Sequence, residues 1–443
     1  MWFIYNVLFT LGYALMLPKF LMHMRRRGGY RRDFGQRLGC YAPDVRAALT
    51  KRRRIWIHAV SVGEVYIANQ FMKAWRVRHP DDSFVLSTTS STGHCTAEGI
   101  MGDGDVLIYY PADFPAVVRR VLNLIRPTVL ILAEGEIWPN MLRCCAARGI
   151  PVAIINGRMS ARSHRGYRCL RPFVRSAAEG LRMILVQTAG DAARWRDLGV
   201  PAARIALAGS LKYDLEPVAL DGAAAARATL ARLGWAPDAP VLVGGSTWAG
   251  EEQALLDALR VLRPRFAALR LVLVPRHAER RAEVLAAIAA SGFTVWSKSG
   301  LASWKEPGSG AAAPDVLLVD TTGELRGYYA AATLVFVGKS LTQTGGQNII
   351  EPAVEHKAIL TGPHLENFPD IAADFDAARA FVHVATAQEL ASAVGRLLDD
   401  PEERIALGAR AAALVEEKRG ALARSVAAVE QMLSEVVKQE GRR

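Results

Sequence analysis

Fourteen short runs of β-branched and aliphatic residues alternate with helix-length amphipathic stretches from Arg54 onward. Apolar strands separated by helices are typical of parallel sheets that helices cover on both faces. The first half of the chain has seven such runs, at Trp56–Val62, Phe84–Ser90, Val106–Tyr110, Val129–Ala133, Val152–Ile155, Ile184–Gln187 and Ile205–Ala208. The second half has seven more, at Val241–Gly244, Leu271–Val274, Phe293–Trp296, Val316–Val319, Leu334–Val337, Ala358–Leu360 and Phe381–Val384. The pattern predicts an α/β protein.

The number of predicted strands exceeds what one such sheet usually holds. Sheets seldom have more than about ten strands, so we expect two Rossmann-like domains of about seven strands each. A chain of 443 residues, 51% hydrophobic and 22% charged, suits two packed domains and excludes a disordered protein. We expect a first domain over residues 25–208, a hinge over 209–222 and a second domain over 223–443. The last helix of the chain could pack either on the second domain or on the first.

The amino-terminal segment is apolar and is followed by a concentration of basic residues. Residues 2–18 contain no charged side chain. About 17–21 apolar residues at ~1.5 Å each reach on the order of 30 Å, the thickness of a bilayer core. Residues 19–54 contain twelve Lys and Arg against two Asp, a local charge of +10 out of a net +12. Such a basic flank is typical of the cytoplasmic side of a membrane segment.

Several interpretations of this segment compete. A cleaved signal peptide is disfavoured, because its positive charges would precede the apolar residues. A transmembrane helix, a helix lying in one leaflet and a buried core helix remain. We expect residues 1–24 to form a membrane-anchor helix, and we expect the chain without them to fold as a soluble protein. Nucleic acid is not an expected partner, because the basic patch adjoins an apolar segment and has few interleaved aromatic residues.

The cysteines and histidines show no metal-binding pattern. The five cysteines, two of them adjacent, form no CxxC pair, and the nine histidines show neither HExxH nor HxH spacing. We interpret the cysteines as reduced thiols of a cytosol-facing protein, and we expect no metal and no cofactor.

Acidic side chains follow two predicted strands of the first domain. Glu64 comes after Ser61-Val62-Gly63, at or near a helix start, where the helix dipole stabilises a carboxylate. It is either an ordinary first-turn glutamate or a base for an acceptor hydroxyl. Glu134 and Glu136 follow the fourth strand and precede Trp138-Pro139-Asn140. Two carboxylates this close are unfavourable as packing, so we expect at least one to be functional.

Four polar turns follow strands of the second domain. They are Gly244-Gly245-Ser246-Thr247, Pro275-Arg276-His277, Thr321-Thr322-Gly323-Glu324 and the glycine-rich stretch Gly338–Pro352. Glycine turns that lead into helices present free amides to an anion, and Arg276 adds a cation. None is a Walker motif, because no Lys-Ser/Thr pair follows at the required spacing. Together the turns predict a nucleotide pocket.

These motifs together resemble the 3-deoxy-D-manno-octulosonic acid (Kdo) transferases of lipopolysaccharide synthesis over nearly the whole chain. The matching segments are the amino-terminal apolar segment, His58–Glu64, Glu134–Asn140, Ser160–Ser163, Gly209–Asp214, Val274–His277, Asp320–Glu324, Gly346–Glu351, Gly362–His364 and Asn367–Phe368. The resemblance implies a GT-B fold, in which an acceptor domain and a nucleotide-sugar domain face each other across a cleft. It also implies a location at the cytoplasmic face of the inner membrane.

The resemblance further implies a reaction and the residues that perform it. The donor would be CMP-Kdo and the acceptor a tetraacyldisaccharide lipid A precursor (lipid IVA), with inversion at the anomeric carbon. Glu64 matches the family's general base, and Glu134 and Lys212 match positions that stabilise the transition state. The positions that match CMP-binding residues are Pro275, Arg276, Thr322, Gly323, Glu324, Asn348, Ile349, Ile350 and Glu351.

Two positions depart from the family pattern, and two other functions compete. Lys339 stands where many members have a second glycine, so it either alters the backbone path of its loop or adds a cation near the donor carboxylate or phosphate. Gln347 replaces a frequent histidine. The competing functions are another two-domain transferase or epimerase that uses a UDP-sugar, and a non-catalytic, membrane-tethered binding protein.

Overall fold

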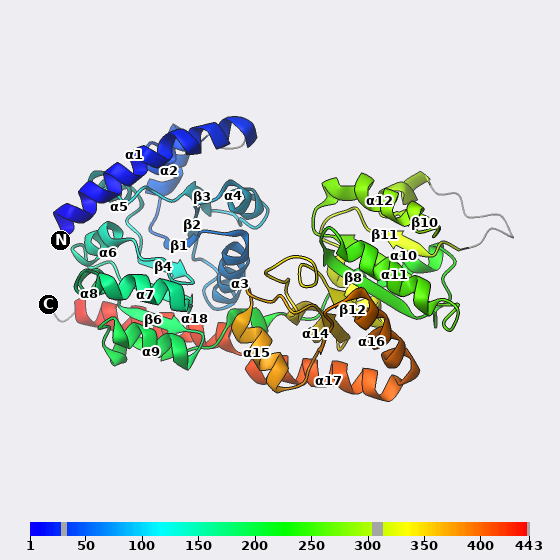
Figure 1. Ribbon diagram of the computed structural model, residues 1–443. Helices are drawn as coiled ribbons and strands as arrows, with labels where there is room; N and C mark the ends of the chain where they lie inside the picture. Colours follow the sequence, from blue (N-terminus) through cyan, green and yellow to red (C-terminus); the bar gives the residue numbers. More distant parts are fainter. Residues whose placement is uncertain (28–32, 304–312, 441–443) are drawn as a thin grey trace. The chain divides into compact units, whose positions relative to one another are not determined.

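The computed structural model describes residues 1–27, 33–303 and 313–440. These residues form two compact units, one from the ranges 1–214 and 419–440 and one from the range 215–418 (Figure 1). Each unit contains a seven-stranded sheet in which every strand pair is parallel. All fourteen predicted strands are present, which confirms the α/β prediction. The units meet in the sequence between Asp214 and Leu215, within the predicted hinge, and the last helix belongs to the first unit.

The sheet of the first unit has the strand order β3-β2-β1-β4-β5-β6-β7. Its strands are β1 (Ile55–Ala59), β2 (Phe84–Thr88), β3 (Val106–Tyr109), β4 (Val129–Ala133), β5 (Val152–Gly157), β6 (Met183–Val186) and β7 (Ile205–Leu207). The helices of this unit that come after β1 in the sequence are α3 (Val62–Arg78), α4 (Ser91–Glu98), α5 (Pro115–Ile125), α6 (Pro139–Ala146), α7 (Ala161–Cys169), α8 (Arg171–Ala178), α9 (Ala189–Asp197) and α18 (Ala421–Glu440). A short helix, α2 (Pro43–Thr50), precedes the first strand.

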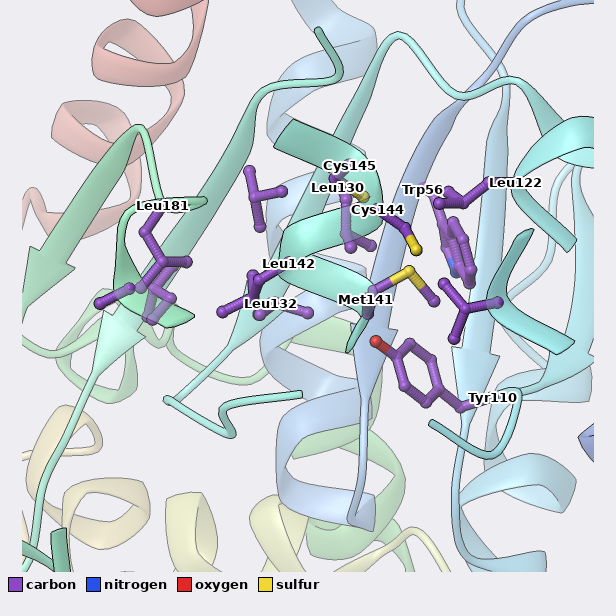
Figure 2. Close-up of a cluster of buried hydrophobic side chains, with 14 of the residues drawn as sticks. Trp56, Tyr110, Leu122, Leu130, Leu132, Met141, Leu142, Cys144, Cys145 and Leu181 are labelled. Atoms are coloured by element: carbon purple, nitrogen blue, oxygen red, sulfur yellow. The ribbon is translucent and has the colours of Figure 1, made fainter. Parts of the chain in front are cut away.

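Apolar side chains cover both faces of this sheet, as the continuous apolar strands predict. Trp56 belongs to one buried cluster and its neighbour Ile57 to another, because successive strand residues point to opposite faces. Figure 2 shows Leu142 of α6 beside Leu132 of β4 in the first cluster. Cys144 and Cys145 are buried in the same cluster, and all five cysteines are free thiols. The second cluster contains residues of α3 and α18.

The second unit repeats this architecture. Its sheet has the order β10-β11-β9-β8-β12-β13-β14. The strands are β8 (Val241–Thr247), β9 (Arg270–Pro275), β10 (Val295–Ser297), β11 (Val316–Leu318), β12 (Leu334–Val337), β13 (Ala358–Thr361) and β14 (Val382–His383). The helices are α10 (Leu220–Arg232), α11 (Glu251–Leu262), α12 (Arg281–Ala290), α13 (Leu325–Ala331), α14 (Ile350–Val354), α15 (Pro369–Ala377), α16 (Ala387–Asp399) and α17 (Pro401–Lys418).

The amino-terminal segment forms the helix α1 (Trp2–Arg27), which contains Pro18. Within residues 1–27, 33–303 and 313–440, no helix combines the length and apolarity needed to cross a membrane. One side of α1 packs on the first unit, where Phe9 and Tyr13 both contact Phe114 edge-on. Apolar side chains elsewhere on the helix are open to solvent, with Leu8 63% and Leu15 81% exposed. Part of the basic flank, at residues 28–32, lies outside the described residues.

Candidate functional site

Glu64 lies in the first turn of α3, directly beyond the carboxyl end of β1. Its carboxylate accepts hydrogen bonds from the Val60 amide at 2.9 Å and the Ser61 hydroxyl at 3.0 Å. The Ser61 hydroxyl in turn accepts from the Glu64 amide at 3.4 Å, so Ser61 caps the helix while its hydroxyl also donates to the Glu64 side chain. Glu64 is only 8% exposed. Burial raises its pKa to about 7, with further upward contributions from the charges of Glu134 and Glu136.

Glu134 follows β4 and forms an ion pair with Lys212, at 3.9 Å between Oε1 and Nζ. Lys212 lies in a short 3₁₀ helix, Leu211–Asp214. Asn156, at the end of β5, links the two, because its Nδ2 donates to Glu134 Oε1 at 3.5 Å and its Oδ1 accepts from the Leu211 amide at 3.0 Å. The structure therefore brings together Glu64, Glu134 and Lys212, the three residues predicted to be catalytic.

Three aromatic rings of the first unit, those of His58, Tyr110 and Trp138, pack together. His58 stacks on Tyr110 with ring centroids 3.7 Å apart, and Trp138 lies 5.4 Å from Tyr110. Burial lowers the pKa of His58 to about 3, so its imidazole is neutral at physiological pH. Burial also raises the pKa of Glu136. Trp138 therefore packs within this cluster, and Pro139 opens α6 as its position in the sequence predicted.

In the second unit, the predicted nucleotide residues lie at or after the ends of β9, β11 and β12, which are in one sheet. The predicted turn Gly244–Thr247 is instead the last part of the neighbouring strand β8. Glu351, in the first turn of α14, accepts a hydrogen bond from Asn348 Nδ2 at 3.2 Å. Burial raises the pKa of Glu351, while Asn348 and the charges of Arg326 and Arg276 lower it in part. Arg276 is anchored through its amide, which donates to Thr247 O at 3.1 Å. Asn348 is thus bonded to the Glu351 carboxylate, and the charge of Arg276 acts on the same carboxylate.

The other predicted nucleotide residues have different surroundings. Glu324 accepts from the Thr321 hydroxyl at 2.5 Å and forms an ion pair with Lys298 at 3.3 Å. Gly323 has a φ of 88°, and its neighbour Thr322 is exposed. Ile349 and Ile350 are fully buried, so their side chains belong to the core. Pro275 is the last residue of β9.

Several residues near these strand ends have left-handed backbone conformations that the sequence did not predict. Glu134, Asn156, Ser246 and Lys339 have φ values of 63°, 54°, 53° and 57°. Non-glycine residues seldom adopt this region, and those that do concentrate at functional sites. Asn156 was missed, although a polar residue before Gly157 at the end of an apolar strand was a usable signal.

The described residues contain no group of three or more His, Cys, Asp or Glu side chains arranged to hold a metal ion.

Comparison with known proteins identifies the family. A family model for 3-deoxy-D-manno-octulosonic-acid transferase (kdotransferase) matches residues 32–215. The 3-deoxy-D-manno-octulosonic acid transferase of Haemophilus influenzae is 31% identical over 96% of this chain and 97% of its own length. That of Bordetella pertussis is 34% identical over 96% of this chain and 99% of its own length.

Solved structures agree on the fold. Anabaena Alr3699/HepE in complex with UDP has a TM-score of 0.55 at 13% identity, covering 87% of this chain and all of its own. A putative UDP-N-acetylglucosamine 2-epimerase from Listeria monocytogenes has a TM-score of 0.57 at 12% identity, covering 87% of this chain and 97% of its own. At such low identity these likenesses establish two parallel-sheet α/β domains and nothing about the substrate. The full-length sequence relatives decide the family, and this chain belongs to the 3-deoxy-D-manno-octulosonic acid transferases, which makes it a glycosyltransferase.

Proposed function

We propose that this enzyme transfers Kdo from CMP-Kdo to a lipid A precursor, lipid IVA, in lipopolysaccharide biosynthesis. Family membership supports Kdo transfer. The observation that carries the mechanism is the buried Glu64 carboxylate, whose pKa of about 7 lets it accept a proton near neutral pH. Within the described residues each of its oxygens accepts one hydrogen bond, which leaves a lone pair for an acceptor hydroxyl.

The reaction is a single displacement. The acceptor hydroxyl oxygen forms a bond to the anomeric carbon of Kdo while the bond from that carbon to the CMP phosphate oxygen breaks. Glu64 takes the hydroxyl proton, and the electron pair of the broken bond leaves with CMP. Attack on the face opposite the leaving group inverts the configuration at the anomeric carbon.

Negative charge that develops on the departing phosphate needs fixed cations and amide donors. Lys212, oriented by Glu134, is one candidate cation, and Arg276 is another. The contact between Asn348 and Glu351 suits a carboxylate that accepts hydrogen bonds from the ribose hydroxyls. The backbone near Gly323, and near Ile349 and Ile350, would supply amides to CMP, since both isoleucine side chains are buried.

The test combines product analysis with one substitution. Purified enzyme, CMP-Kdo and lipid IVA should yield a Kdo-bearing lipid that mass spectrometry detects, whereas UDP-sugars should yield none. Glu64→Gln keeps the size of the side chain and one oxygen that accepts a hydrogen bond, but it cannot take the proton. We expect this variant to lose about 10²–10⁴-fold in transfer while CMP binding is unchanged. Loss of CMP binding along with transfer would make Glu64 a structural residue only.

We further propose that α1 lies in the cytoplasmic leaflet of the inner membrane. One side of α1 contacts the first unit, and apolar side chains elsewhere on it are exposed, including Phe3 at 79% and Leu15 at 81%. A helix held in this way presents an apolar surface to the acyl chains, as interfacial helices do. Vesicle binding by the full chain, absent when the exposed side is made polar, is the measurement that tests this location.

A further inference from the structure

Trp248 and Lys339 form a cation–aromatic pair that the proposed reaction does not use. Trp248 follows β8 and Lys339 follows β12, two adjacent strands in which Gly245 lies opposite Val337. The Lys339 ammonium lies 4.9 Å from the centroid of the Trp248 ring. The His277 ring contacts the same indole edge-on at 5.1 Å. The pair therefore lies at the carboxyl ends of the strands, where parallel sheets bind ligands.

Lys339 reaches this position through an unusual backbone. Its φ of 57° is left-handed, the conformation that a glycine at this position would adopt freely. The preceding Gly338 admits no side chain, because a Cβ there would lie 2.5 Å from Ser246 O. Lys339 thus has a backbone conformation that glycine also adopts, and its side chain adds a cation at this point of the loop.

Glu251 holds the two halves of the pair together. It is fully buried at the start of α11, and its carboxylate accepts four backbone N–H groups. One oxygen accepts from both Trp248 and Lys339, each at 2.8 Å, and the other accepts from Ser340 and Leu341 at 2.8 and 2.9 Å. A single buried carboxylate thus fixes the backbone of the aromatic residue and of the cation.

The ammonium of Lys339 is available to a ligand. Three other cations near these strand ends are paired with carboxylates, namely Lys298 with Glu324, Arg281 with Asp320 and Arg326 with Glu355. Lys339 makes no ion pair with any described residue, and an aromatic face leaves its full charge free for an anion. The Trp248 Nε1–H is also buried without a partner in the described part of the chain.

We propose that Lys339 and Trp248 form a subsite for the carboxylate of the donor sugar acid, and that Glu251 is its positioning residue. The inference rests on the proposed function, whose donor carries two anions, a phosphodiester and a sugar carboxylate. Arg276 and the neighbouring turns match positions that bind CMP, which contains only the phosphate. Lys339 lies at the same strand ends and is not one of those positions, so it is the cation that we assign to the second anion.

The test compares CMP-Kdo with CMP, which lacks the carboxylate. Lys339→Met should raise KM for CMP-Kdo about tenfold or more, as expected for loss of a charged hydrogen bond, while the inhibition constant of CMP stays within about twofold. If Lys339→Met weakens the binding of CMP-Kdo and of CMP equally, Lys339 binds the phosphate and the proposal is wrong. If neither binding changes, the proposal is also wrong. If the wild type does not turn over CMP-Kdo at all, the proposed function fails instead, so the two failures are distinct.

The positioning role of Glu251 is tested by comparing its substitution with that of Glu252. Glu251→Gln presents an amide NH₂ to backbone N–H groups and should raise KM for CMP-Kdo with kcat nearly unchanged. Glu252→Gln is the matched control, because Glu252 is equally buried but pairs with Arg280 and Thr247. It should lower the melting temperature without raising that KM. In a Lys339→Met background, Glu251→Gln should add little further loss, and full additivity would contradict the positioning role.

Discussion

The hydroxyl of Tyr5 in α1 donates a hydrogen bond of 2.8 Å to the buried carboxylate of Asp113. The same carboxylate accepts the backbone amides of Asn140 and Met141 at 2.9 and 2.8 Å, at the start of α6. The amino-terminal helix is thus bonded to the segment that continues from Glu134 into α6. It is part of the first unit, and a chain without residues 1–24 would lose the bond from Tyr5 to Asp113. That such a chain folds as a soluble protein stays a prediction.

Tyr5→Phe should therefore destabilise the protein, because Tyr5 joins the amino-terminal helix to the rest of the first unit. The substitution leaves a buried carboxylate with one bond fewer, which costs about 1–2 kcal/mol of unfolding free energy. Urea unfolding measures the change. Leu8→Ala is the control, because Leu8 is 63% exposed and should alter stability by less than about 0.5 kcal/mol. Equal effects of the two substitutions would mean that the contact with Asp113 does not support the fold.

Membrane association should depend on the exposed side of the same helix. Changing Leu8 and Leu15 together to Gln should weaken binding to anionic vesicles at least about tenfold, because each leucine loses roughly 1.5–3 kcal/mol of burial. Val77→Gln is the matched control, since Val77 is 84% exposed on α3 rather than on α1. Co-sedimentation with vesicles gives the readout. Unchanged binding in the double variant would place the membrane contact elsewhere on the protein.

The pH dependence of transfer should follow Glu64. The base must be ionised, and burial raises its pKa to about 7, so kcat/KM should rise tenfold per pH unit below about 7 and level off above it. Glu134→Gln removes a like charge that raises this pKa, so the acid limb should move to lower pH even though the rate falls. An acid limb that does not move in this variant would show that the two carboxylates are not coupled.

The raised pKa of Glu64 also makes the stability of the fold depend on pH. The folded state favours protonated Glu64, because its folded pKa is about 7 against an ordinary value of 4.5. Its contribution to stability is therefore complete below about pH 4.5 and is lost as the pH rises to about 7. At the pH where the base works, Glu64 opposes folding, which is the expected behaviour of a residue kept for catalysis.

The strands could be predicted because a buried parallel strand needs a continuous apolar run, which is local information. Contacts between distant residues could not. Nothing in the sequence separates Glu251, which accepts four amides, from Glu252, which pairs with Arg280. The backbone groups that Glu251 binds lie as far along the chain as Leu341, and their approach depends on strand order. Glu64 was recognisable from its motif, but its pKa depends on burial and on charges after another strand.

Asn156 is the positioning residue that the sequence analysis missed, and it allows a sharp test. Its side chain joins Glu134 to the segment that carries Lys212, while its φ of 54° suits glycine as well as asparagine. Asn156→Gly keeps the backbone but removes both bonds, so kcat should fall about tenfold with KM for CMP-Kdo unchanged. Asn156→Ala should lower kcat similarly but destabilise the fold by about 1–2 kcal/mol more, because alanine is strained in this conformation. Rates and melting temperatures of the two variants separate the loss of the hydrogen bonds from the strain in the backbone. If kcat falls only in the variant that is destabilised, Asn156 has a structural role alone.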